Sequence, residues 1–319
     1  MGGEARSARP PATAEQVEAA RRDTKLAQVL YHDWEAGTYD DKWSISFDQR
    51  CIDYVRDRFV AIAGEDGWPY APALEIGAGT GFFSLNLVQA GALEQVTVTD
   101  LSPGMVEAAQ RNARGLGFEV AGEVADAESL PFPDATFEIV VGHAVLHHVP
   151  DVEQAFHEIL RVLRPGGCFV LCGEPTRYGD LVARRLSRAT WEVATRVTRL
   201  PPLRSRWARP QVELDESSRA AALEAVVDLH TFDPGVLRRT ALRAGAIDVR
   251  TVTEELTAAW FGWPVRTLEH ALPRERLGLR WAQFAYHGWL GLSAVDRRLA
   301  RVVPGELFYN VSLTGTRPG

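Results

Sequence analysis

The sequence predicts an α/β fold in which a mostly parallel sheet of seven strands carries helices on both faces, with helical insertions in its C-terminal half. Three observations support this prediction. Short apolar runs alternate with helix-period patterns from residue 73 onward. The first apolar run ends in a glycine-rich turn that leads into a helix, as a buried parallel strand does. Two long segments then interrupt the alternation, and they contain six of the nine tryptophans.

Composition narrows the class of protein. Hydrophobic residues make up 46% of the 319-residue chain and charged residues 24%, as in a soluble globular protein. The formal net charge of −7 argues against a general polyanion binder. Cys51, Cys168 and Cys172 lack zinc-ligand spacing, so we expect buried reduced thiols. The chain has no apolar signal region and no run of about 18 apolar residues. We therefore expect a cytoplasmic protein without a transmembrane segment.

The N-terminal region predicts a tail and a helical lid. Residues 1–14 are small, polar and proline-containing, which favours disorder. Helical patterns cover residues 15–31 and 48–63. Between them, Tyr39 and Trp43 lie in a segment that mixes aromatic and charged residues densely. Such a segment either packs a helix onto the domain or covers a ligand.

The glycine turn is the central motif. An apolar strand over residues 73–76 contains Glu75 and is followed by Gly77, Gly79 and Gly81. Glycines let the backbone pass close to a ligand, and the N–H groups of the following helix face it. A dinucleotide fingerprint requires a glycine where Phe82 stands, so the spacing argues against a nicotinamide dehydrogenase.

Acidic residues end the next two predicted strands. The strand over residues 95–99 closes on Asp100, and Ser102 and Pro103 then begin a helix. A carboxylate in this place can accept both hydroxyls of a ribose. The third strand, over residues 119–125, ends in Asp126.

The fourth strand, over residues 136–141, leads into a loop with three histidines, His143, His147 and His148. No Glu lies between the first two as in a zinc protease, so we expect no metal. A helix over 152–163 ends at Arg-Pro-Gly-Gly, and Glu174 follows a fifth strand over 168–172. The remaining core elements are a helix over 233–244 and strands over 246–253 and 307–316.

These motifs, in this order, resemble the class I S-adenosylmethionine (SAM) dependent methyltransferases. The similarity is to the ubiquinone and menaquinone biosynthesis group (methyltransferase domain 11/25-like), and it covers roughly residues 39–174. It implies a Rossmann-like core in which SAM is bound and S-adenosylhomocysteine is the product. The cofactor-binding positions implied by the resemblance are Tyr39, Trp43, Glu75, Gly77, Ala78, Gly79, Gly81, Asp100, Leu101, Met105, Asp126, Ala127 and His143.

The resemblance also implies a reaction, namely methyl transfer to an oxygen or carbon of an apolar small molecule. A quinone, a polyketide, a lipid or another secondary metabolite would suit such a site. If the acceptor needs a base, position favours His147, then His143, with Glu174 a further candidate. Two alternatives stay open: a peptide or RNA methyltransferase, and a SAM-binding protein without catalysis. The loop after the fourth strand lacks the Pro-Pro-aromatic motif common in nucleic-acid methyltransferases, so we expect no nucleic-acid partner.

The predicted division of the chain is a disordered tail over 1–14, a lid over 15–64, a SAM-binding core over 65–174, a first cap insertion over 175–230, a core helix and strand over 231–253, a second cap insertion over 254–305, and a last strand and tail over 306–319. We expect the cap to form its own core and to wall the acceptor pocket. The first insertion combines many arginines with an apolar helical stripe. This pattern is typical of a solvated basic face or of contact with an anionic membrane surface.

Overall fold

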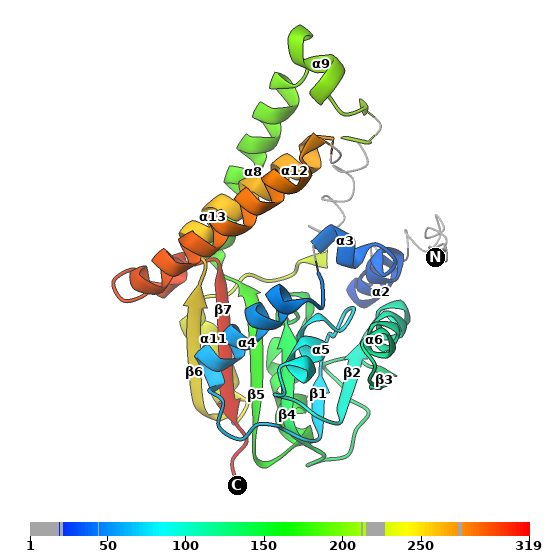
Figure 1. Cartoon of the computed structure of the whole chain (residues 1–319). Coiled ribbons are helices and arrows are strands. Elements are labelled where there is room, and N and C mark those ends of the chain that lie inside the picture. Colours follow the sequence, from blue (N-terminus) through cyan, green and yellow to red (C-terminus); the bar gives the residue numbers. More distant parts are fainter. Residues whose placement is uncertain (1–18, 20–21, 44, 212, 215–226, 274–275) are drawn as a thin grey trace.

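The computed structural model describes residues 19, 22–43, 45–211, 213–214, 227–273 and 276–319, and it contains one seven-stranded sheet (Figure 1). The strand order is β3-β2-β1-β4-β5-β7-β6. The first five strands in this order run parallel, and β7 is antiparallel to both β5 and β6. The predicted fold class is confirmed. The strands are β1 (Ala73–Glu75), β2 (Val96–Asp100), β3 (Ala121–Val124), β4 (Phe137–His143), β5 (Leu163–Pro175), β6 (Ile247–Glu254) and β7 (Asn310–Thr316).

Helices cover both faces of the sheet. One face packs against α4 (Gln49–Ala63), α5 (Phe82–Gln89) and α6 (Pro103–Gly115), and the other against α7 (Val152–Val162) and α11 (Pro234–Arg243). Successive residues of β4 alternate between the two hydrophobic cores, since Val140 faces one core while Ile139 and Val141 face the other. The central strands are therefore buried on both sides.

Several predicted boundaries differ from the observed ones. The second part of the helix predicted over 15–31 is observed as α2 (Thr24–Glu35), whose N-terminus is capped by Asp23, whereas residues 15–18 and 20–21 lie outside the described residues. The Arg-Pro-Gly-Gly segment, predicted as a turn before the fifth strand, lies within β5, which pairs with β4 on both sides of a bulge. The last strand begins at Asn310 rather than 307, after a short 3-10 helix, η3 (Gly305–Leu307). The predicted tail over 1–14 lies outside the described residues.

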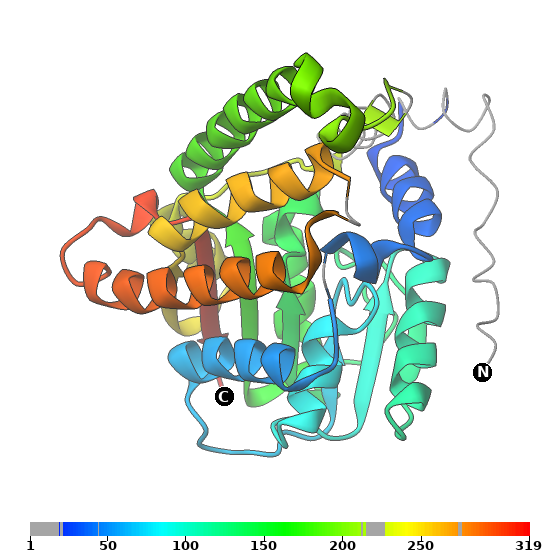
Figure 2. The ribbon, with the colours of Figure 1, turned by 45° about the horizontal axis from the view of Figure 1, so that its top comes forward.

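The two insertions form a projecting arm. The helices of the arm whose bounds lie within the described residues include α8 (Arg177–Val197), α9 (Pro201–Trp207), α12 (Thr257–Ala271) and α13 (Gly278–Leu299). α12 packs against both α8 and α13, and the three lie side by side above the sheet (Figure 2). Among the described helices, each is too short or too polar to span a bilayer.

The interior of the arm is not the aromatic core that the tryptophans predicted. The buried residues of α8 are small, namely Gly179, Ala183 and Ala194, and a Cβ on Gly179 would lie 2.4 Å from the backbone of Tyr309. None of the six arm tryptophans is fully buried, and Trp260 is 44% exposed. These six are Trp191, Trp207, Trp260, Trp263, Trp281 and Trp289.

A buried carboxylate joins α13 to α12. Asp296 is 3% exposed and accepts hydrogen bonds from the backbone N–H groups of Leu256, Thr257 and Ala258, at 2.9 to 3.0 Å. These are unpaired donors at the start of α12, so Asp296 caps that helix from a different element.

We predict that Asp296→Asn lowers the free energy of unfolding by about 3 kcal/mol, because three buried donors lose a charged acceptor. Urea denaturation monitored by tryptophan fluorescence measures the loss. The matched control is Asp57→Asn on the exposed side of α4, which should change stability by less than about 0.5 kcal/mol. An equal, small effect of both substitutions would contradict this account of the arm.

Candidate active site

A cleft of about 140 Å³ opens at the carboxyl ends of β1, β2 and β4. The strand order reverses at β1, because β2 and β3 lie on one side of it and β4 and β5 lie on the other. Open α/β sheets bind ligands at such a point. Of the predicted cofactor positions, those that line the cleft are Tyr39, Glu75, Gly77, Ala78, Gly79, Asp100, Leu101, Asp126, Ala127 and His143.

The three motif glycines have different tasks. All three have positive φ angles, 55°, 53° and 86° in chain order, which glycine adopts without strain. A Cβ on Gly77 would lie 2.2 Å from the side chain of Val145, and a Cβ on Gly81 would lie 2.7 Å from Leu85. A Cβ on Gly79 would meet only the Tyr39 ring, at 3.8 Å. Gly77 and Gly81 therefore permit packing, and Gly81 does not line the cleft.

Glu75 lies at the floor of the cleft and is almost completely buried. Its carboxyl group contacts the backbone N–H of Ser84 at 3.3 Å and the Ser84 hydroxyl. Burial raises the pKa of Glu75 to about 8, which the contacts with Ser84 only partly offset. Glu75 therefore holds a proton at neutral pH.

Asp100 joins the glycine turn to the start of α6. Its Oδ2 accepts the Gly79 N–H at 2.9 Å, and its Oδ1 accepts the Ser102 N–H at 2.8 Å. Burial raises the pKa of this carboxyl group above its usual value. Each oxygen keeps a second lone pair, so Asp100 can still accept hydroxyl groups of a ligand.

The lid helix α2 contacts the tips of β2 and β3. Asp33 accepts the Gly104 N–H at 2.8 Å and the Ser102 hydroxyl. Lys25 binds the carboxylate of Asp126 at 2.5 Å and also contacts Glu128. No sequence pattern pointed to Lys25, since the two partners of its ion pair with Asp126 lie 101 positions apart.

Besides Gly81, two predicted cofactor residues do not line the cleft. Trp43, on α3 (Tyr39–Trp43), does not line the cleft. Its ring lies 3.8 Å from the guanidinium carbon of Arg266 on α12, and Arg266 also donates to the Lys42 carbonyl at 3.0 Å. Met105 is completely buried and does not line the cleft either. Both side chains serve packing in this structure.

The three histidines occupy different environments. His143 lines the cleft, its Nε2 is buried without a hydrogen-bond partner, and the rings of Phe82 and Phe83 lie 5.4 and 5.5 Å away. Burial, together with the charge of Arg58, lowers the pKa of His143 to about 4, so this ring is neutral at pH 7. His148 lines the cleft too, whereas His147 does not.

Glu174 fixes the loop that carries these histidines. The side chain is completely buried. Its Oε1 accepts the N–H groups of Val145 and Leu146 at 2.9 and 2.8 Å, and its Oε2 accepts the backbone N–H of His147 at 3.1 Å and contacts His147 Nδ1 at 2.9 Å. Burial tends to lower the pKa of His147, but the hydrogen bond and charge of Glu174 outweigh it and raise that pKa. Both side chains are directed to each other and lie outside the cleft.

A cation site was not predicted, and the one candidate cluster of the described residues is His147, His148 and Asp228. The Nδ1 atoms of the two histidines are engaged by Glu174 and by the Val227 carbonyl. Arg184 already approaches the Asp228 carboxylate to 3.5 Å. A positive guanidinium beside the only carboxylate of the cluster opposes the binding of a second cation.

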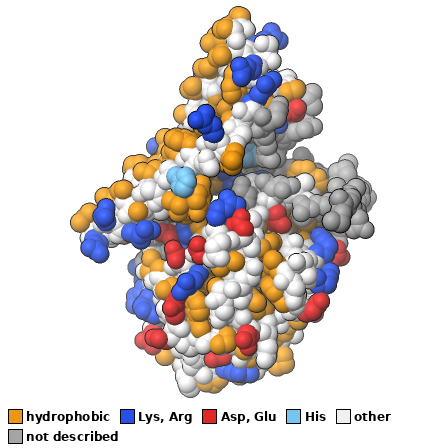
Figure 3. All heavy atoms as spheres, in the orientation of Figure 1, with side chains coloured by type: hydrophobic (Ala, Val, Ile, Leu, Met, Phe, Trp, Pro, Cys, Tyr) orange, Lys and Arg blue, Asp and Glu red, His pale blue; other side chains and the backbone are white. Residues whose placement is uncertain are grey.

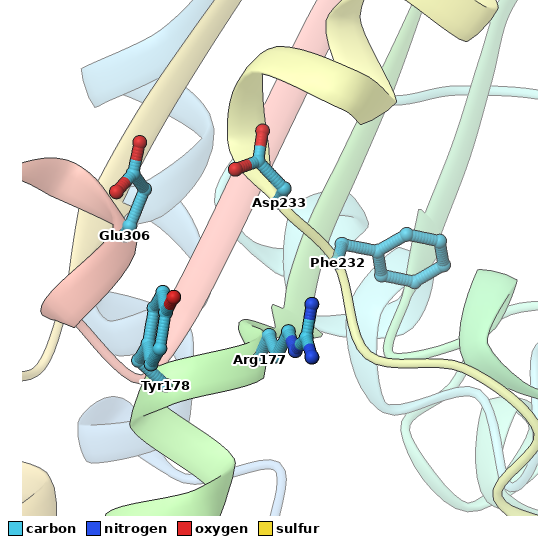
Figure 4. A pocket seen from close by; sticks show the side chains of 5 residues that line it. All are labelled: Arg177, Tyr178, Phe232, Asp233 and Glu306. Carbon is cyan, nitrogen blue, oxygen red and sulfur yellow. The ribbon is translucent and has the colours of Figure 1, made fainter.

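A second, smaller pocket of about 70 Å³ lies between the starts of α8 and α11 and η3. Its lining residues are Arg177, Tyr178, Phe232, Asp233 and Glu306 (Figure 4). In Figure 4 the Phe232 ring is directed away from Tyr178 and Glu306. This pocket contains none of the predicted site residues.

Part of the chain matches known proteins. The family described as methyltransferase domain matches residues 74–171. The demethylmenaquinone methyltransferase of Thermus thermophilus is 37% identical over 102 residues, which cover 32% of this chain and 46% of that protein. The ubiquinone/menaquinone biosynthesis C-methyltransferase of Desulfotalea psychrophila is 36% identical over 135 residues, or 41% and 52% of the two chains. The malonyl-[acyl-carrier protein] O-methyltransferase of Geobacter sulfurreducens is 35% identical over 124 residues, or 38% and 46%.

The matched segments span about half the length of these curated relatives. Among solved structures, phosphoethanolamine N-methyltransferase 2 of Haemonchus contortus aligns with a TM-score of 0.51 at 16% identity, covering 91% of this chain and 60% of that chain. This likeness supports the fold. The family match and the sheet order agree with the motifs at the strand tips. The chain therefore carries a methyltransferase domain of the class I SAM-dependent kind, and it resembles the ubiquinone and menaquinone biosynthesis group.

Proposed function

We propose that this protein transfers a methyl group from SAM to an apolar small-molecule acceptor. The observation that carries the proposal is the convergence of Gly79, Asp100 and Asp126 on one cleft within the methyltransferase domain. These groups come from the ends of three successive strands. Together they offer donors and acceptors to one elongated, polar ligand.

The residues present fit the cofactor. Glu75 would receive the amino group, Asp100 the ribose hydroxyls, and Asp126 with the Ala127 N–H the adenine, while Tyr39 covers Gly79. When bound, SAM supplies an activated methyl group on a positive sulfur. The protein binds and orients the two reactants and keeps water out, and such positioning is a major source of rate acceleration.

His143 is the better placed of the candidate bases. It lines the cleft, and its buried Nε2 has no hydrogen-bond partner among the described residues, so this atom is open to an acceptor hydroxyl. His147 and Glu174 instead hold each other and the loop backbone. We therefore assign them a positioning role.

The acceptor side of the cleft is aromatic. The Tyr54 ring lies 6.2 Å from His143 and 5.8 Å from Trp289 of α13, so the arm supports the wall behind His143. The described residues of α8, α9, α12 and α13 do not line the cleft themselves. The expectation that the cap walls the pocket directly is therefore wrong for these helices. Relatives named for demethylmenaquinone and for 2-methyl-6-phytyl-1,4-hydroquinone support a quinol-type acceptor.

Asp100→Asn should weaken SAM binding by about 10- to 100-fold, because a neutral amide replaces a charged acceptor. Isothermal titration calorimetry measures the dissociation constant. The control Asp248→Asn, at an exposed position, should leave it unchanged. Binding of NAD with an affinity similar to that of SAM would contradict the proposed cofactor.

Binding of SAM should release a proton that comes from Glu75. The folded apoprotein holds Glu75 protonated below about pH 8. An ammonium group beside the carboxyl stabilises the carboxylate and lowers its pKa. The affinity for SAM therefore rises with pH and levels off above about pH 8, by linkage.

Calorimetry in buffers of different ionisation enthalpy measures this release. At pH 7 the wild type should release up to about one proton more than Glu75→Gln, which has no proton to lose. If the wild type and Glu75→Gln release the same number of protons, the amino group of SAM does not bind beside Glu75.

His143→Ala should lower kcat by about 100-fold with a demethylated quinol as acceptor, since it removes the proposed base. The dissociation constant of SAM should change little, which separates catalysis from binding. His147→Ala is the matched control, and product analysis by mass spectrometry should show kcat within a few fold of the wild type. If His147→Ala lowers kcat much more than His143→Ala does, His147 is the base instead.

A further inference from the structure

We propose that the outer end of the arm, residues 181–207 on α8 and α9, is a docking surface for an anionic lipid membrane. We call these residues the arm tip. It projects farther from the sheet than the other described helices (Figure 1). It contains none of the residues that line the cleft.

An exposed apolar stripe runs along the arm tip. Val193 and Val197 lie one turn apart on α8, and Leu200 follows just beyond the end of that helix; they are 60%, 43% and 51% exposed. Ala183 and Ala194 are buried and lie on the same side of α8 as the two valines. The apolar side of the helix is therefore covered only in part by the described residues and is exposed at Val193 and Val197.

Arginines flank the stripe. Residues 181–207 contain seven arginines and one acidic residue, although the whole chain has a net charge of −7. Glu192, the acidic residue, already pairs with Arg196 at 3.5 Å. In Figure 3 basic and hydrophobic side chains lie side by side on the arm. Arg185, Arg188, Arg196 and Arg199 are exposed, and Arg196 directly precedes Val197 on α8.

This combination matches a membrane surface better than other polyanions. Aliphatic side chains enter the boundary between head groups and acyl chains, while guanidinium groups pair with lipid phosphates. A nucleic acid would use the arginines but would leave Val193, Val197 and Leu200 without a contact, because bases stack on aromatic rings rather than on valine. The described helices are not suited to span a bilayer, so the contact is peripheral.

Co-sedimentation with vesicles tests the proposal on the full-length protein without any methyl acceptor. Vesicles of phosphatidylcholine alone are compared with vesicles that contain phosphatidylglycerol, at low and high salt. We expect binding to the anionic vesicles only, and weaker binding as salt rises.

Two double variants remove one component each. Arg196→Gln with Arg199→Gln should lower the partition coefficient by about 30-fold, since each arginine contributes about fivefold near an anionic surface. Val193→Ser with Val197→Ser should lower it by about tenfold or more, because it removes apolar area from the lipid contact. The matched controls are Arg111→Gln with Arg114→Gln on α6, and Val236→Ser with Leu242→Ser on α11.

The control variants should bind as the wild type does, and SAM affinity should be the same in all five proteins, which shows that each is folded.

Three results would overturn the proposal. The first is equal binding to neutral and anionic vesicles, or to neither. The second is an equal loss in arm-tip and control variants. The third is an RNA or acidic-peptide affinity that exceeds vesicle binding and does not depend on the two valines.

Discussion

The buried carboxylate of Glu174 is the contact on which the shape of the cleft depends. It accepts three consecutive backbone N–H groups of the loop after β4 and also contacts the His147 ring. That loop presses Val145 against Gly77, where a Cβ would not fit. The turn that begins at Gly77 then presents the Gly79 N–H to Asp100. The ends of β5, β4, β1 and β2 are thus connected in one chain of contacts.

Such a connection explains why charge is tolerated inside the domain. Removing a carboxylate from water is costly unless its lone pairs are satisfied, and Glu174 is satisfied by backbone groups that would otherwise lack partners. Glu75 lies in a similarly buried place, where the hydrogen bonds that the described residues give to its carboxyl group come from Ser84, and burial raises its pKa to about 8. The two buried acids thus differ in the number of backbone donors that reach their oxygens.

Much of the core followed from local sequence because local rules decide it. Residues such as Ile139 and Val140 alternate between two cores, and the glycine turn and Asp100 mark strand ends by their position. Contacts between distant segments left no such signal. The stack of Trp43 on Arg266, the ion pair of Lys25 with Asp126 and the role of Glu174 all join elements that periodicity cannot relate. The arm tryptophans were misjudged because aromatic content alone does not specify a buried core.

The stack of Arg266 on Trp43 has a mechanical consequence. Arg266 belongs to α12, whose other neighbours are the long arm helices, while Trp43 ends α3, whose first residue covers the glycine turn. The guanidinium also donates to the Lys42 carbonyl, so it holds both a ring and a backbone group of that short helix. If the arm tilts relative to the sheet, either the contacts of Arg266 with Trp43 and Lys42 must break, or α3 and its residue Tyr39 must move with the arm.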